Sequence, residues 1–163
     1  MYIGQVDALK DPAHWAVVAT TLAVISVIIG LHYEVLRGCI RFLPAVTHKR
    51  RQRVVVLILI IMLTHAAEIW IFGLAYLFLL QWEATGVIDG AVAFRSVLDH
   101  VYFSGMVYTT VGFGDLIPHG AIRFMTGMEA LTGLVMITWS ASFTFLEMQR
   151  DWRVGSDRGP RTD

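Results

Sequence analysis

The residues of this sequence best suited to bind a ligand lie at positions 109–115, which read Thr-Thr-Val-Gly-Phe-Gly-Asp between two long apolar runs. Irregular backbone is costly in a bilayer, and it is tolerated only where protein buries it or where it lines a polar path. Glycines permit positive φ values, which allow an extended segment to turn successive carbonyl oxygens toward one axis. Rings of such carbonyls can replace the hydration shell of a cation. One chain supplies only one side of a ring, so several copies would have to surround the axis.

The composition is typical of a membrane protein. Of the 163 residues, 56% are hydrophobic and 16% are charged, whereas a soluble domain has roughly 25% charged residues. A transmembrane helix needs about 20 apolar residues, and three runs are long enough: residues 15–36, 54–82 and 124–146. The formal net charge is +0, which gives no reason to expect a nucleic-acid partner.

The segment between the second and third runs predicts a helix that enters the membrane and stops near its middle. Ser96 and Asp99 fit a capping box, and a helix from there to Thr109 would have about 13 residues and a length of roughly 20 Å. Residues 86–90 are expected to form a turn, and residues 110–115 are expected to leave the membrane as an extended strand. The predicted fold class is an all-α membrane protein with three transmembrane helices, a re-entrant helix and an extended loop.

The basic residues predict the orientation. Residues 37–53 include six Lys or Arg residues and no acidic residue, and four more Arg residues follow position 149. By the positive-inside rule, the N-terminus is expected outside and the C-terminus in the cytoplasm, with the protein in the plasma (inner) membrane.

Residues 108–115, Tyr-Thr-Thr-Val-Gly-Phe-Gly-Asp, resemble the signature of the tetrameric potassium channel family. The resemblance covers about residues 54–150 and implies an outer helix, a pore helix, a selectivity filter and an inner helix. It also implies a homotetramer in the lipid bilayer that conducts K⁺ passively and needs no cofactor. By this resemblance Gly114 opens the outer mouth, Asp115 supports the filter from behind, and K⁺ is bound at the filter residues Thr110, Val111, Gly112 and Phe113.

The aromatic residues around the filter depart from the family pattern. Phe113 stands where many relatives have a tyrosine that bonds to a pore-helix tryptophan, and the corresponding pore-helix residues here are Tyr102 and Phe103. Tyr102 could reach Asp115 and support the filter, or it could simply be an interface aromatic.

The third run contains the residues expected to form the cavity and gate. Gly133 matches the family's inner-helix hinge glycine, although a small residue that allows close packing is the alternative. Counting by fours from Gly133 places Ile137, Ala141 and Phe145 on one face, which is expected to line the cavity. Phe145 would be the inner constriction, where a hydrophobic ring can gate by dewetting.

Two carboxylates, Glu68 and Glu129, lie within the predicted spans. A charge near the bilayer centre costs at least about 2.5 kcal/mol, so neither residue should face lipid. We expect them to hydrogen-bond to pore-helix groups such as Ser104 or Tyr108 and to support the filter. His65 lies one turn before Glu68 on the same helix face. A role as pH sensor is the alternative for either carboxylate, and the family resemblance assigns neither role.

The histidines outside this region are expected to have simpler surroundings. His14, His32 and His48 lie near the predicted membrane boundaries and are expected to be solvated. His100 is expected to be packed and hydrogen-bonded inside the pore helix. His119, near the outer mouth, could sense pH or be an inert exposed histidine.

The sequence predicts three parts: an N-terminal helix with a basic cytoplasmic loop (residues 1–53), a pore domain (54–150) and a short cytoplasmic tail (151–163). The first helix lacks the repeated arginines of a voltage sensor and is expected to pack outside the pore. Alternatives to a potassium-selective channel are a less selective cation channel, a transporter subunit and a non-conducting accessory protein. Cys39 is the only cysteine, which excludes an intrachain disulfide and a Cys-x-x-Cys metal site. No nucleophile, metal cluster or nucleotide loop in the sequence indicates an enzyme.

Overall fold

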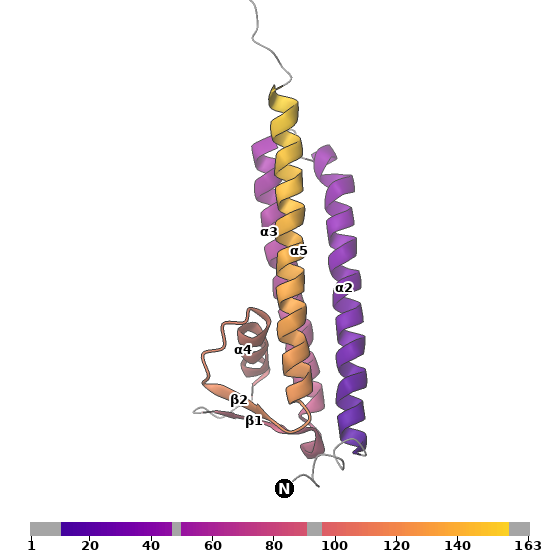
Figure 1. The fold of residues 1–163 in the computed structure, drawn as a ribbon, viewed down its shortest axis with the longest axis vertical. Coiled ribbons are helices and arrows are strands. Elements are labelled where there is room, and N and C mark those ends of the chain that lie inside the picture. Colours follow the sequence, from indigo (N-terminus) through magenta and orange to yellow (C-terminus); the bar gives the residue numbers. More distant parts are fainter. Residues whose placement is uncertain (1–10, 47–49, 91–95, 157–163) are drawn as a thin grey trace, which may run out of the picture.

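Three long helices lie side by side in the computed structural model, which describes residues 11–46, 50–90 and 96–156 (Figure 1). They are α2 (Pro12–Val46), α3 (Arg50–Leu79) and α5 (Arg123–Ser156). All three helices are long and apolar enough to cross a membrane. The three predicted spans are therefore confirmed as helices, and the all-α fold class holds for the described chain.

The shorter elements gather at the end of the bundle where α2 and α5 begin (Figure 1). They follow α3 in the order η1 (Glu83–Thr85), β1 (Val87–Gly90), α4 (Val97–Tyr108) and β2 (Leu116–His119). The two strands pair antiparallel, with Val87 opposite His119 and Gly90 opposite Leu116. This small sheet ties the chain before α4 to the chain after it.

Helix α4 is the predicted re-entrant helix. Its 12 residues span about 18 Å, which is little more than half of a hydrocarbon core of about 30 Å. The predicted capping box is present: the Ser96 hydroxyl accepts from Asp99 N at 3.1 Å, and the Asp99 carboxylate accepts from Ser96 N at 2.7 Å. The capping box provides hydrogen-bond acceptors for backbone N–H groups at the N-terminal end of α4, where the chain is expected to enter the membrane.

The structure corrects three boundaries. Residues 87–90 form β1 rather than part of a turn, because β2, about 30 residues later in the sequence, supplies hydrogen-bond partners. Helix α2 continues ten residues beyond Leu36 and ends at Val46, so Pro44 lies in its last turn. Helix α5 extends to Ser156 and so includes the first six residues of the predicted tail (151–163), while the rest of that tail lies outside the described residues.

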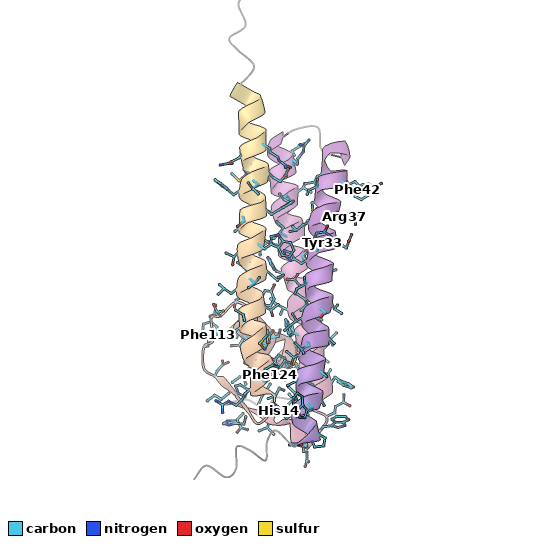
Figure 2. All side chains as sticks on the ribbon, turned by 45° about the vertical axis from the view of Figure 1, so that its right-hand side comes forward. His14, Tyr33, Arg37, Phe42, Phe113 and Phe124 are labelled. Carbon is cyan, nitrogen blue, oxygen red and sulfur yellow. The ribbon has the colours of Figure 1, made fainter. Side chains whose placement is uncertain are left out.

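Helix α2 packs on the other two long helices along one stripe. Its buried residues recur at intervals of mostly three, four or seven: Ala13, Val17, Thr21, Ile28, His32, Leu36, Cys39 and Leu43. This spacing is that of one helix face. Large apolar side chains such as Tyr33 and Phe42 are exposed on the remaining surface, as expected for contact with lipid. Figure 2 shows these side chains on α2, with Phe113 on the opposite side of the bundle.

Two clusters of buried residues hold the bundle together. The larger one joins α3, α4 and α5 through Phe72, Tyr76, Phe103, Tyr108 and Met136. The smaller one joins α2 to the first half of α3 and includes Leu36, Cys39 and Leu57. The short helix α4 is therefore fixed mainly by α3 and α5, while α2 adds Val17 and Ile28 to the larger cluster.

Gly133 lets α5 touch the last turn of α4. A Cβ atom at this position would lie 2.1 Å from the Tyr108 carbonyl oxygen, far inside van der Waals contact. Helix α5 continues through this residue. Close packing thus accounts for the glycine in this structure, and the hinge role stays a prediction.

We expect Gly133→Ala to lower the melting temperature of the purified protein, by the equivalent of about 1–3 kcal/mol of overpacking. The clashing atom belongs to the backbone and cannot swing aside. Gly127→Ala is the matched control on the same helix, since an added Cβ there meets nothing within 4 Å. Thermal unfolding in detergent compares the two variants, and equal melting temperatures would contradict the close approach.

Candidate functional site

The candidate site is centred on residues 109–115, here called the signature loop, which follows the C-terminal end of α4. All seven residues are exposed in the single chain, and the Phe113 side chain is 70% exposed. Figure 2 shows Phe113 projecting on the side of the bundle away from α2. The loop therefore presents its backbone to whatever lies beside this face of the chain.

The sign of the backbone φ angle alternates along the signature loop, with positive values at every second residue. Thr110, Gly112 and Gly114 have φ values of 59°, 48° and 78°, whereas Val111 and Phe113 are not in the positive-φ region. In a regular strand, alternate residues face opposite ways, and inverting φ at every second residue turns successive carbonyls toward one side. The positive φ values predicted for the glycines are confirmed. The loop is not the simple extended strand that was expected, and the positive φ of Thr110 is uncommon for a β-branched residue.

The start of the loop is tied back to the last turn of α4. Thr110 N donates to Val107 O at 2.9 Å, and Gly112 N donates to Met106 O at 3.2 Å. The C-terminal end of a helix carries a partial negative charge. The loop therefore begins at a point that favours a cation.

Tyr102 and Asp115 connect α4 to the far end of the loop. The Tyr102 hydroxyl donates to Asp115 Oδ2 at 2.9 Å, so the predicted contact is confirmed. This hydrogen bond raises the pKa of Tyr102, and the phenol keeps its proton as donor at neutral pH. Phe103 points the other way and packs edge-on against Tyr76, with ring centroids 5.0 Å apart.

Glu129 of α5 is fully buried between α3 and α4. Its Oε2 accepts from the Tyr76 hydroxyl at 2.6 Å, and its Oε1 accepts from the Ser104 hydroxyl. The same Ser104 oxygen lies 2.8 Å from the carbonyl of Ile69. One carboxylate thus joins the middle of α4 to both neighbouring helices.

Glu68 of α3 is also fully buried and has three partners. Tyr108 of α4 donates its hydroxyl to Oε2. His65 Nδ1 lies 3.0 Å from Oε2, and His32 Nδ1 of α2 lies 2.8 Å from Oε1. The expected hydrogen bonds of the two carboxylates to Ser104 and Tyr108 are therefore confirmed.

The two bonded groups of α4 share one face. Ser104 and Tyr108 are four residues apart, one helical turn, and each bonds to one buried carboxylate. Tyr108 lies only two residues before Thr110, where the signature loop begins its alternating backbone. These bonds fix the position of the helix end from which the loop departs.

The expectation that His32 is solvated is wrong. Its side chain is fully buried, and its Nε2 lies 3.0 Å from the Ser140 hydroxyl of α5. Because α2 continues to Val46, His32 lies well inside the helix. The sequence signal was its spacing, four residues after Ile28 and four before Leu36 on the buried stripe.

The other histidines differ in their burial and in their contacts. His100 is buried, and its Nδ1 lies 2.7 Å from Ser96 O, which confirms the expected packing. His14 is half-buried, with its ring centroid 6.4 Å from that of Phe124, so the solvated expectation holds only in part. His119 is exposed, with Nε2 3.6 Å from an Asp89 carboxylate oxygen. His48 lies outside the described residues.

The residues predicted to line the cavity fall on one side of α5. Ile137, Ala141 and Phe145 are exposed in the single chain, and they line a groove of about 360 Å³ between α5 and α3. Residues of α3 such as Met62 form the other wall. Their assignment to an axial cavity and gate stays a prediction.

Comparison with known proteins agrees with this architecture. The family model described as "Ion channel" matches residues 53–150, more than half of the chain. An uncharacterized membrane protein of Bacillus subtilis (strain 168), YdjJ, is 44% identical over 46 residues, which cover 28% of this chain and 14% of that protein. No solved structure matches the chain. Together with three helices able to span a membrane, the match over residues 53–150 shows that this integral membrane protein belongs to the ion channel family.

Proposed function

We propose that the chain is one subunit of a homotetrameric, potassium-selective channel in which the signature loop is the selectivity filter. The observation that carries the proposal is the positive φ at Thr110, Gly112 and Gly114. Such an alternation would turn successive backbone carbonyls toward one side. Carbonyl rings can replace the hydration shell of K⁺, and residues 110–113 would supply them, with the Thr110 hydroxyl at the innermost site. K⁺ is the permeant ion, and conduction needs no cofactor.

The need for several copies follows from the exposure of the loop. A lipid-facing loop with irregular backbone would leave polar groups without partners, yet all seven residues of the signature loop are exposed in one chain. Each chain contains one such loop, so four chains around an axis would enclose the backbone and complete the rings. The exposed face of Phe113 would then contact neighbouring subunits.

The arrangement of charges supports an orientation with the signature loop outside. Arg37 and Arg41 lie in the second half of α2, which is distant from the loop, and α5 ends at the same end of the bundle (Figure 1). With basic residues inside, the N-terminus is outside and the C-terminus is cytoplasmic. A location in the plasma (inner) membrane is part of the same proposal.

Two other functions compete with this one. A less selective cation channel would keep the fold and lack discrimination between K⁺ and Na⁺; the presence of Phe113 between two glycines favours a complete set of carbonyl sites. A non-conducting accessory protein would assemble in the membrane and pass no ions.

Reversal potentials in planar bilayers decide among these functions. With K⁺ on one side and Na⁺ on the other, the tetramer should show current whose reversal potential is displaced strongly toward the K⁺ equilibrium potential. Thr110→Ala should retain the tetramer and reduce K⁺ conductance, while the matched change Thr20→Ala on α2 should alter neither. A reversal potential near zero with clear current would indicate the less selective channel, and reconstituted tetramer without current would indicate an accessory protein.

We further propose that Glu68 and Glu129 brace the filter by holding α4. Both carboxylates bond to α4. Helix α4 ends at Tyr108, two residues before Thr110, the first proposed ion-binding residue. In the proposed tetramer, the positions of the four signature loops depend on the ends of the four α4 helices. A substitution that loosens one brace is present in every chain, so its effect occurs four times in the assembly.

Tyr76→Phe tests the brace at Glu129. The variant leaves one buried carboxylate oxygen without its donor, which typically costs about 1–3 kcal/mol per chain, so the tetramer should melt at a lower temperature. Tyr33→Phe is the matched control, because Tyr33 is exposed on α2. The brace proposal fails if both variants melt like the parent protein.

A further inference from the structure

His32, His65 and Glu68 form a buried cluster of metal-ligand side chains on two helices. One donor atom from each of the three residues lies within 4.8 Å of the others. The side chains of His32 and Glu68 are fully buried, and that of His65 is 14% exposed. The sequence does not bring these residues together, since 36 positions separate His32 from Glu68.

The distances suit a tetrahedral ion. Zn²⁺ bonds to imidazole nitrogen and carboxylate oxygen at about 2.0–2.1 Å, which places neighbouring ligand atoms roughly 3.3 Å apart. The two Nδ1 atoms lie 2.8 and 3.0 Å from the oxygens of Glu68. The three donor atoms lie within 4.8 Å of one another, so no pair would have to move by more than about 1.5 Å to reach this spacing. The Tyr108 hydroxyl donates to Glu68 Oε2 and would orient this carboxylate as a ligand.

The surroundings of His32 also fit a ligand. A metal-bound histidine normally donates its second ring N–H to a nearby acceptor, which fixes the ring orientation. With a metal on Nδ1, the Nε2–H of His32 would donate to the Ser140 hydroxyl, which lies 3.0 Å away. The imidazole is thus held from α5 with its other nitrogen turned toward Glu68.

Charge and access favour a cation at this point. Glu68 is fully buried among apolar helices, where a carboxylate charge is costly unless it is compensated, and a bound cation would compensate it. His65 and Ser140 line the groove of about 360 Å³ between α3 and α5. The groove gives an ion a path to the exposed edge of His65.

We propose that His32, His65 and Glu68 bind Zn²⁺, and that the ion clamps α2 to the rest of the channel. Two imidazoles and a carboxylate, without thiolate, are a ligand set that Zn²⁺ accepts. The site uses residues of α2, which lies outside the matched family region. It does not depend on the selectivity of the signature loop.

The test uses the full-length protein in detergent, stripped of metal and freed of any histidine tag, and titrated with Co²⁺ and then Zn²⁺. We expect visible absorption bands of tetrahedral Co²⁺ that saturate at one ion per chain and disappear when Zn²⁺ is added. X-ray absorption of the Zn²⁺ form should show two imidazole ligands. Absence of the tetrahedral bands, or absence of imidazole from the Zn²⁺ spectrum, would overturn the proposal without any variant.

Variants identify the ligands. His32→Ala and Glu68→Gln should each weaken Zn²⁺ binding at least about tenfold and should abolish the rise in melting temperature that Zn²⁺ causes in the parent. His14→Ala and Glu34→Gln are matched controls, because both residues lie on α2 outside the cluster. Unchanged binding in the cluster variants would refute the site.

Discussion

Polar groups inside a bilayer must find partners within the protein, and this constraint shapes the whole chain. The three long helices meet it through their own backbone bonds. Helix α4 satisfies this constraint only for the backbone groups in its interior. Because its 12 residues are too short to cross the membrane, its last carbonyls and the signature loop need other partners. The loop amides of Thr110 and Gly112 use carbonyls of that last turn. The loop residues remain exposed in the single chain, and in the proposed filter a dehydrated cation would compensate for many carbonyl oxygens at once.

The same constraint explains the two buried carboxylates. An ionised glutamate facing lipid would be costly, but each of these accepts hydrogen bonds from hydroxyl groups on neighbouring helices. The bonds from Ser104 and Tyr108 also have a geometric effect, because each fixes one turn of α4 against α5 or α3. Gly133 adds to this by allowing α5 to reach the Tyr108 carbonyl. The result is a short helix whose end is held by polar bonds and close packing together.

The sequence was most informative where the pattern is local. Apolar runs located the three spans, the capping box located the start of α4, and the glycine pattern anticipated the positive φ values in the loop. It was least informative where distant segments meet. The strand at residues 87–90 depends on β2 across the signature loop, and the burial of His32 depends on the contacts of α2 with α3 and α5. The partners of Glu68 and Glu129 could be anticipated because both spans had to bury a charge beside α4. The position of Gly133 against Tyr108 was not predictable, since the spacing suited both a hinge and a close contact.

The central claim is that residues 110–113 of four chains surround one axis and bind permeant ions with their backbone carbonyls. The most direct measurement is an experimental structure of the purified assembly in Tl⁺, with anomalous scattering used to locate the ions. The account predicts four chains related by one axis and a row of ion peaks on that axis, each ringed by carbonyl oxygens of the signature loop. An assembly with a different number of chains, or Tl⁺ peaks absent from the loop, would contradict it.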